Sequence, residues 1–499
     1  MSYLAVDLGT TNIKAILYDD NLEPLAQQSE RVVYQKQDNR VEFDAEEYFQ
    51  ILLRLIAGCC SQAYSRPPYP VAQIVLTGQA ESLVPLDGSG RPSRRAISWL
   101  DMRSQAECEE LRRVFEPDMS YRVTGQPEII PTWPATKILW IRKNEPDCFA
   151  KTAKYLLLKD YILFRLSGEI AGDHTIYNFS HYFDIVRKTY WADMLRYCGV
   201  SESQLPMTVP SCTVIGSLTA SCAQVLGIPP TAKVNVGTLD HFAGMIGTGN
   251  IKPGTVSEST GTVLALASLV DRPLFTPERL QLHCGPFEGT YVFLPVCESG
   301  GISLEWFKNA FLENESFEEM NRACAGKQLP GGMVFLPYLT GANAPDFNMD
   351  ASGVFFGFKE HSDKYDFALA VMEGVAHMLH RNIRQLASAG IHAGGIISTG
   401  GGSKSALWCQ MKADITGCTV KVPENTEAAC LGAAIIGAVS EGRFQDYESA
   451  VNSCVRMKTE YTPIRQREYS MKTELYDSVY AGLQASFRLH AKVRREQGN

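Results

Sequence analysis

The chain has 499 residues, of which 45% are hydrophobic and 20% are charged, so it is long enough for two large packed domains. Its formal net charge of -8 argues against nucleic acid as a partner, because phosphate backbones attract basic surfaces. The sequence offers no apolar stretch long enough to cross a membrane, no signal-peptide pattern and no zinc-binding cysteine spacing. We therefore expect a cytoplasmic protein without a membrane partner.

The N-terminal region is predicted to form an antiparallel meander. Residues 2–8 and 12–18 have the apolar character of short strands, and the Asp-Asp-Asn segment at 19–21 suits the turn into a third strand. A helix is predicted from about Asp44, because Asp44 and Glu47 match a capping box. Residues 71–76 then form a buried strand that runs into Thr-Gly.

The loop between the first two strands has the composition of a phosphate-binding hairpin. Gly9 lets the backbone approach a phosphate group closely, and Asp7 can hold Mg²⁺ or its waters. An ordinary β-turn explains Gly-Thr-Thr equally well. The side chains that could bind phosphate oxygens are Thr10, Thr11, Asn12 and Lys14.

Part of this order recurs in the second half of the chain. Residues 259–262, Ser-Thr-Gly-Thr, lie between extended apolar segments, and the strand at 396–398 also runs into Thr-Gly. Two related domains explain the recurrence, and so does a coincidence of short Gly-Thr segments. We place the domains at residues 1–247 and 248–499.

Two glycine-containing segments of the second half could bind a nucleotide. The first is residues 259–262, although an ordinary turn also explains this segment. The second, residues 400–405, lies between a strand and a helical stretch, whose N-terminus favours anionic groups. Walker A and Rossmann patterns do not fit, because Ser403 precedes the lysine and Ser405 occupies the last glycine position. The nucleotide-binding candidates are Gly261, Thr262, Gly401, Gly402 and Ser405.

Asp240 stands where a predicted strand meets a predicted helix. A carboxylate at such a junction can reach into a cleft and accept a proton from a hydroxyl group. A helix cap is the simpler role for an aspartate at this position. The neighbouring His241 suits a structural hydrogen bond better than catalysis.

Taken together, these segments resemble the FGGY family of carbohydrate kinases, and within it the xylulose kinases. The family includes kinases for xylulose, ribulose, glycerol and gluconate. Residues 132–140, Thr-Trp-Pro-Ala-Thr-Lys-Ile-Leu-Trp, are similar to its first signature. Residues 353–357, Gly-Val-Phe-Phe-Gly, with the segment 366–373, are similar to the second. Thr132 and Phe358 depart from the usual residues.

The resemblance implies an α/β fold of two ribonuclease-H-like domains, as in actin, hexokinase and Hsp70, with a cleft between them. It implies ATP and Mg²⁺ as cofactors and Asp240 as the general base that accepts the proton of a sugar hydroxyl. It assigns Asp7, Thr11 and Lys14 to the first phosphate loop, and it assigns residues 261–262 and 401–402 to the second phosphate loop and the adenosine side.

The sugar pocket is expected at residues 79–82 and 98–103. Glu81 and Asp101 can accept hydrogen bonds from sugar hydroxyls, and Trp99 can cover an apolar sugar face. Alternatively, Glu81 pairs with Arg103 and only shapes the wall. The substrate-binding candidates are Gln79, Ala80, Glu81, Trp99, Asp101, Asp240 and His241.

The identity of the small-molecule substrate is less sharply indicated. Xylulose kinases usually have Met-His at residues 80–81 and glycerol kinases have Arg-Glu, whereas this chain has Ala-Glu. A Glu-Arg pair common near residues 341–345 is also missing. The leading substrate is a ketopentose such as xylulose, with glycerol or another polyol as the alternative. A remote alternative is an actin- or Hsp70-like ATPase, and a homodimer is possible.

Overall fold

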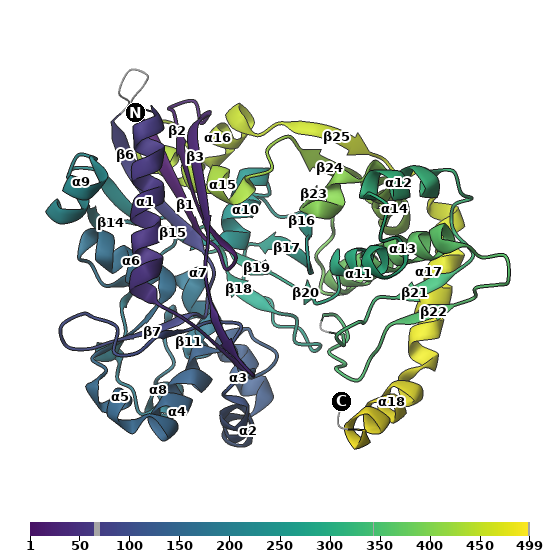
Figure 1. The fold of residues 1–499 in the computed structure, drawn as a ribbon, viewed down its shortest axis with the longest axis horizontal. Helices are drawn as coiled ribbons and strands as arrows, with labels where there is room; N and C mark the ends of the chain where they lie inside the picture. Colours follow the sequence, from purple (N-terminus) through teal and green to yellow (C-terminus); the bar gives the residue numbers. More distant parts are fainter. Residues whose placement is uncertain (64–69, 343, 498–499) are drawn as a thin grey trace. The chain divides into compact units, whose positions relative to one another are not determined.

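The structure is a computed structural model that describes residues 1–63, 70–342 and 344–497. It has the expected α/β architecture and divides into two compact units (Figure 1). The units are made of alternating chain segments: unit 1 of Met1–Ile251, Val270–Val292 and Glu427–Val455, and unit 2 of Lys252–Leu269, Phe293–Thr426 and Arg456–Asn499. The domain division expected at residues 247 and 248 stays a prediction.

A six-stranded mixed sheet forms the centre of unit 1. Its strand order is β14 (Val214–Ser217), β15 (Lys233–Leu239), β6 (Val71–Gly78), β1 (Ser2–Leu8), β2 (Asn12–Tyr18) and β3 (Pro24–Arg31). β1 pairs antiparallel with β2 and parallel with β6, and β6 pairs parallel with β15. The predicted meander is therefore confirmed, and β1, β6 and β15 end at the same edge of the sheet.

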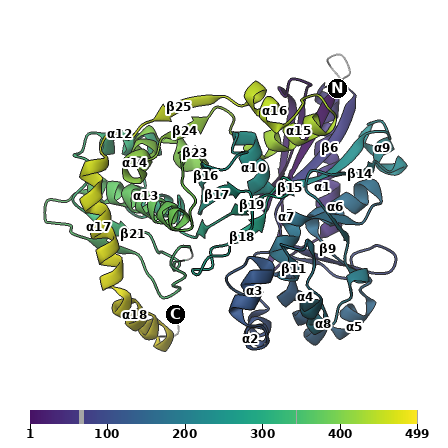
Figure 2. The ribbon, with the colours of Figure 1, turned by 180° about the vertical axis from the view of Figure 1, so that it is seen from behind.

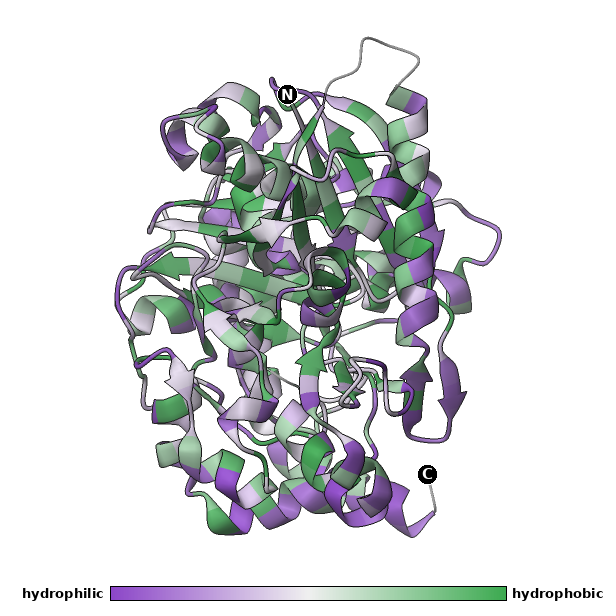
Figure 3. Ribbon diagram, turned by 90° about the vertical axis from the view of Figure 1, so that its left-hand side faces the viewer, coloured by the Kyte–Doolittle hydropathy of each residue, from purple (hydrophilic) through white to green (hydrophobic). Residues whose placement is uncertain are grey.

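Helices cover both faces of this sheet (Figure 1). Successive residues of a strand point to opposite faces, so Leu4 packs with α1 (Ala45–Ala63) and α6 (Leu158–Ser167), whereas Tyr3 packs with α10 (Asp240–Thr248) and α15 (Ala428–Ser440). The predicted start of α1 is confirmed, because Asp44 Oδ1 accepts hydrogen bonds from the backbone N–H groups of residues 46 and 47 at 2.9 and 3.1 Å. Figure 3 shows the central strands as largely hydrophobic.

α10 and α15 cross at a pair of glycines. A Cβ atom on Gly247 would overlap the carbonyl oxygen of Ala428, and one on Gly432 would overlap the carbonyl oxygen of Ala243. The two helix backbones therefore approach more closely than side chains would allow. This crossing fixes the start of α15, where Glu427 forms an ion pair with Lys14 of β2.

The rest of unit 1 surrounds this core. A second sheet runs in the order β4 (Gln35–Gln37), β5 (Arg40–Phe43), β8 (Ala96–Ile97), β7 (Leu83–Leu86) and β9 (Lys154–Leu157). Shorter strands are β10 (Ala171–Asp173), β11 (Phe183–Asp184), β12 (Thr189–Tyr190), β13 (Met207–Val209), β18 (Leu282–Cys284) and β19 (Tyr291–Phe293), the last at the unit boundary. The remaining helices are α2 (Gln105–Val114), α3 (Pro117–Thr124), α4 (Pro134–Asn144), α5 (Pro146–Lys151), α7 (His174–Tyr177), α8 (Ala192–Cys198), α9 (Ala220–Leu226) and α16 (Tyr447–Cys454).

Unit 2 repeats the strand pairing of unit 1. Its sheet contains β17 (Leu264–Val270), β16 (Thr255–Thr260), β23 (Gly395–Thr399), β24 (Val420–Pro423) and β25 (Met457–Tyr461), in this order. β16 pairs antiparallel with β17 and parallel with β23, as β1 does with β2 and β6. The hairpin, helices and Thr-Gly strand recognised twice in the sequence thus have the same local topology in both units.

Helices α13 (Lys364–Ser388) and α14 (Ala406–Thr416) pack together beside this sheet (Figure 2). The other elements of unit 2 are β20 (Val296–Cys297), β21 (Val334–Leu336), β22 (Val354–Phe356), α11 (Ile302–Phe311), α12 (Phe317–Ala325), α17 (Gln466–Gly482) and α18 (Gln484–Glu496). Among the described residues, the helices are either too short or too polar to cross a membrane.

Candidate active site

Three carboxylates meet at the edge of the unit 1 sheet where β1, β6 and β15 end. Asp7 is the penultimate residue of β1, Glu81 follows the end of β6, and Asp240 is the first residue after β15. The charge of Asp240 interacts with the carboxyl groups of both Asp7 and Glu81. Parallel strand pairing therefore brings together three acids that lie far apart in the sequence.

Asp240 opens helix α10 without capping it. The N-cap residue is Leu239, and Asp240 Oδ1 accepts a hydrogen bond from the backbone N–H of His241 at 2.6 Å. The strand before it is held by Thr77, whose hydroxyl donates to the carbonyl of Thr238 at 3.0 Å. The simpler role of helix cap does not account for Asp240, and its second oxygen, Oδ2, makes no hydrogen bond with the described residues.

Asp7 has an unsatisfied oxygen. Its Oδ1 atom is buried and has no hydrogen-bond partner within the described part of the chain. Burial raises the pKa of Asp7 to about 7; the charge of Asp240 adds to this effect and the ammonium group of Lys14 opposes it. A divalent cation would satisfy the orphan oxygen and offset the repulsion between the two carboxylates, so the residues present fit a metal.

Glu81 has a buried carboxyl group and a backbone φ of 68°. Burial raises its pKa to about 7, whereas the charge of Lys137 and a hydrogen bond from the Thr132 side chain favour the ionised form. Lys137 is buried as well, and its ammonium group donates to the carbonyls of Glu81 and Ser98 at 3.3 and 2.9 Å. The charge partner of Glu81 is thus Lys137.

Arg103, the partner considered for Glu81 in the sequence, is engaged elsewhere. It contacts Asp101 through Nε at 2.8 Å and through a terminal nitrogen at 2.7 Å, and it also forms an ion pair with Glu42. Asp101 is fully buried and accepts a further hydrogen bond from the backbone of Val41 at 2.6 Å. In this structure the oxygens of Asp101 hold the loop together, and its contact with a sugar stays a prediction.

The expected sugar loop contacts the first hairpin. Trp99 Nε1 donates to the Thr10 hydroxyl at 2.8 Å, and Gln79 Oε1 accepts from the Ser82 hydroxyl at 2.7 Å. Ala80 is buried beside them. His241 is exposed. The segment near residues 341–345, where a Glu-Arg pair is missing, includes position 343, which lies outside the described residues.

The first hairpin is shaped by Gly9, because a Cβ atom there would lie 2.5 Å from the carbonyl oxygen of Asn12. Thr11 and Asn12 are exposed at its tip. A cavity of about 380 Å³ borders the hairpin and is lined by Thr10, Thr11, Arg31, Val32, Val33, Tyr34, Lys36 and Leu100. Thr10 and Thr11 of the hairpin therefore border this open space.

In unit 2, the second hairpin and the glycine-rich loop lie together at the end of β16 and β23. Gly261 and Thr262 are exposed at the hairpin tip, and Gly401 is exposed in the neighbouring loop. Gly402 is buried, since a Cβ atom on it would lie 2.7 Å from Thr260 Cβ. The parallel pairing of β16 with β23 thus unites the two predicted nucleotide segments.

Ser405 has a structural role in this loop. Its hydroxyl accepts from the backbone N–H of Trp408 at 3.2 Å, which caps α14, and donates to Asn321 Oδ1 at 2.7 Å. A direct contact with a nucleotide stays a prediction for Ser405, as it does for the other candidates.

The sequence did not single out Lys137 or Glu427, which the structure places at the site. Lys137 could have been suspected, since it is the one charged residue in the apolar signature at 132–140. Glu427 gives no local signal, because its contact with Lys14 depends on the return of the chain to unit 1.

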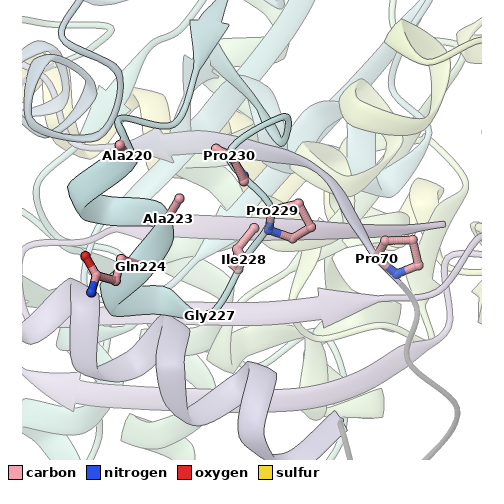
Figure 4. A pocket seen from close by; sticks show the side chains of 8 residues that line it. All are labelled: Pro70, Ala220, Ala223, Gln224, Gly227, Ile228, Pro229 and Pro230. Carbon is pink, nitrogen blue, oxygen red and sulfur yellow. The ribbon is translucent and has the colours of Figure 1, made fainter.

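A cavity of about 720 Å³ lies at the opposite edge of the unit 1 sheet (Figure 4). Pro70 precedes β6 and Pro230 precedes β15, so the cavity borders the starts of the strands whose ends carry the acids. Its lining is mostly apolar and consists of Pro70, Ala220, Ala223, Gln224, Gly227, Ile228, Pro229 and Pro230. The cavity is therefore separate from the candidate active site.

Comparison with a solved structure first shows the fold. The fold matches that of a solved xylulose kinase from Rhodospirillum rubrum with a TM-score of 0.91, at 24% identity, over 98% of this chain and 100% of that one. This likeness shows that the chain has the same overall α/β fold as that protein, in agreement with the fold expected from the sequence.

The sequence comparisons then show the family. Residues 2–247 and 276–441 match the N-terminal and C-terminal domain models of the FGGY family of carbohydrate kinases. A xylulose kinase of Staphylococcus epidermidis is 30% identical, with 96% of each chain covered. A gluconokinase of Bacillus subtilis is 28% identical, with 94% of this chain and 93% of that one covered. The chain belongs to the FGGY family of carbohydrate kinases.

The expected enzyme class is therefore confirmed. The protein is a phosphotransferase that acts on a small-molecule sugar. Kinases of this family take the phosphoryl group from ATP and typically require a divalent metal.

Proposed function

We propose that this kinase phosphorylates a neutral ketopentose such as xylulose, with Asp240 as the general base. The observation that carries the proposal is the meeting of Asp7, Glu81 and Asp240 at one edge of the unit 1 sheet. The 30% identity to xylulose kinases supports the choice of sugar.

Charge balance at this edge favours a neutral substrate. The ammonium group of Lys14 is paired with Glu427, and that of Lys137 is bound to two backbone carbonyls. The nearby carboxylates outnumber these two cations, so an anionic sugar acid would be repelled. Sugar hydroxyls, in contrast, can donate hydrogen bonds to Glu81. The face of Trp99 can at the same time cover the apolar face of the sugar, in its ring or open-chain form.

Asp240 would accept the proton of the reacting hydroxyl through Oδ2. Its Oδ1 atom is held by the backbone N–H of His241, which keeps the carboxylate in one orientation. A positioned carboxylate can act as a base at neutral pH, and general bases contribute about 10²–10⁴-fold to the rate. Closure of the two domains around the phosphates, which is part of this proposal, would exclude water from the reaction.

Asp7 would hold Mg²⁺, directly or through a water molecule. Its buried Oδ1 lacks a partner among the described residues, and carboxylate oxygen is a preferred ligand of this cation. When bound, the cation neutralises charge on the β- and γ-phosphates. Thr10, Thr11 and Asn12 would bind phosphate oxygens on the unit 1 side, and the segments at 261–262 and 401–402 would bind the nucleotide on the unit 2 side.

A phosphotransfer screen tests the proposal. ADP release is measured with xylulose, ribulose, glycerol, erythritol and gluconate, and we expect the highest kcat/KM with a ketopentose. Glycerol or erythritol as the best substrate would favour the polyol alternative. Efficient phosphorylation of gluconate would contradict the charge argument directly. The Asp240→Asn variant is the control that assigns ADP release to this site.

A homodimer and a cytoplasmic location, both expected from the sequence, stay predictions. Size-exclusion chromatography with light scattering measures the first, and fractionation of the source cells measures the second.

A further inference from the structure

Unit 2 contains an ion pair that is wholly inaccessible to solvent. Glu258 of β16 and Lys412 of α14 both have 0% exposed side chains, and Lys412 Nζ lies 2.5 Å from Glu258 Oε1. Removing two charges from water is unfavourable unless their geometry and remaining hydrogen bonds compensate. An apolar pair would fill the same space, so packing alone does not explain these residues.

The pair is completed by two hydroxyl groups at the ends of neighbouring strands. Lys412 Nζ donates to Thr260 Oγ1 at 2.8 Å and to Ser398 Oγ at 3.3 Å. Thr260 Oγ1 in turn donates to Glu258 Oε2 at 2.7 Å, and the Ser398 hydroxyl donates to Oε1. The Thr260 hydroxyl is therefore fixed from both sides, once as an acceptor and once as a donor.

Thr260 lies between the two segments expected to bind the nucleotide. It immediately precedes Gly261 at the hairpin tip. A Cβ atom on Gly400 would lie 2.8 Å from the Thr260 carbonyl oxygen, and one on Gly402 would lie 2.7 Å from Thr260 Cβ and 3.4 Å from Lys412 Nζ. The glycine-rich loop thus rests directly on Thr260.

We propose that Glu258 and Lys412 are positioning residues that hold Thr260 and thereby set the spacing between the hairpin at 261–262 and the loop at 400–402. The inference rests on the proposed function, since it assumes that both segments bind the nucleotide. Neither charged side chain would touch the nucleotide. Their loss should weaken nucleotide binding and leave the sugar pocket of unit 1 unaffected.

The test removes both charges together. In Glu258→Leu with Lys412→Met, no unpaired charge remains, and such replacements are often neutral for stability. We expect the KM for ATP and the Kd for the fluorescent nucleotide mant-ADP to rise at least about tenfold, while the KM for the sugar changes less than about twofold. Unchanged nucleotide constants in the folded double variant would overturn the proposal.

A matched control exists in the same unit. Glu373 of α13 and Lys472 of α17 form another buried ion pair, with 1% and 7% exposed side chains, and Lys472 also bonds to the carbonyl of Gly331. Glu373→Leu with Lys472→Met should leave the nucleotide constants unchanged. An equal loss of nucleotide affinity in this control would show a general effect of buried pairs and overturn the proposal.

A second pair of variants decides the matter if the double variant does not fold. Thr260→Val keeps the shape but removes the hydroxyl, whereas Thr260→Ser keeps the hydroxyl. We expect the rise in Kd for mant-ADP in Thr260→Val and its absence in Thr260→Ser; equal constants in the two would overturn the proposal. Because mant-ADP binding needs no turnover, a wild type that fails to phosphorylate every sugar would refute the proposed function separately.

Discussion

The hairpins of the two units have the same strand pairing but place their acids differently. Asp7 of β1 is opposite Thr77 of β6, and Ser259 of β16 is opposite Thr399 of β23. By this register Ser259 corresponds to Asp7, and Glu258 corresponds to the buried Val6. The acid of unit 1 thus keeps an unsatisfied oxygen, whereas the acid of unit 2 points to the other face of its strand and is neutralised by Lys412.

The same strand topology can therefore present a carboxylate in two roles, either as a ligand-binding group or as a buried group that orients its neighbours. A carboxylate on one face of the strand end is available to a cation or a substrate. Shifted by a single residue to the opposite face, a carboxylate becomes part of the interior and can only orient its neighbours. This contrast agrees with our proposals that proton transfer takes place in unit 1 and that unit 2 holds the nucleotide.

The largest expected effect is in unit 1. Asp240→Asn keeps the shape of the side chain but cannot accept the proton, so kcat should fall about 10²–10⁴-fold. Affinity for mant-ADP should stay within about twofold of the wild type, because the unit 2 segments are untouched. A variant with more than about a tenth of wild-type turnover would break the assignment of proton transfer to unit 1.

The next effect concerns the stability of unit 2. Glu258→Gln leaves the ammonium group of Lys412 buried without its counter-charge, which should destabilise unit 2 by about 3–5 kcal/mol. For a unit of this size the thermal midpoint should fall by roughly 6–20 °C. Calorimetry measures the shift, and the double change Glu258→Leu with Lys412→Met should recover most of it. A midpoint within 2 °C of wild type, roughly the shift expected for 1 kcal/mol, would contradict the prediction.

Glu81→Gln should separate sugar binding from nucleotide binding. Weakening a charged hydrogen bond worth roughly 1.5–3 kcal/mol should raise the KM for the sugar about 10- to 150-fold. The KM for ATP should hardly change. If stability falls while sugar kinetics stay the same, Glu81 is structural.

The pH dependence of the sugar KM sharpens this prediction. Burial raises the pKa of Glu81 to about 7, so the carboxyl group is mostly protonated below that pH and ionised above it. Only the ionised form is a charged acceptor, and the sugar KM should therefore decrease as pH rises through about 7. The profile should flatten in Glu81→Gln, and an identical profile in both proteins would exclude Glu81 as its source.

The smallest expected effect is a gain in stability. In the absence of divalent metal, Asp7→Asn removes a partly buried charge with an unsatisfied oxygen, so unit 1 should become more stable by about 1 kcal/mol. Added Mg²⁺ should raise the thermal midpoint of the wild type more than that of the variant. If the variant is less stable than the metal-free wild type, Asp7 is satisfied in the fold and the contrast between the hairpins fails.

Local patterns in the sequence predicted the elements that carry the site. The apolar runs before Gly9 and Gly78 gave β1 and β6, and Asp44 marked the start of α1. These signals are local, because strand alternation and helix caps depend on a few neighbouring residues. The family signatures indicated the enzyme class, which the comparisons confirm.

Long-range partners could not be predicted in the same way. Lys137 lies within the first family signature, but its interaction with Glu81 depends on how two distant segments pack. The pairing of Arg103 with Asp101 and Glu42 likewise follows from the fold of the loop. Such contacts are set by tertiary structure. The sequence contains several basic residues near these acids, and it does not show which of them forms the ion pair.

The late return of the chain to unit 1 has a consequence for its synthesis. Helix α15 packs on Tyr3, Ala5 and Val75, so the part of this sheet face that α10 does not cover stays exposed until residues 428–440 have been made. Residues 1–251 therefore expose an apolar surface during the time in which the intervening unit 2 sequence is translated. The core of unit 1 is therefore completed only after residues 428–440 have been synthesised, and expression of residues 1–251 alone should yield aggregated protein.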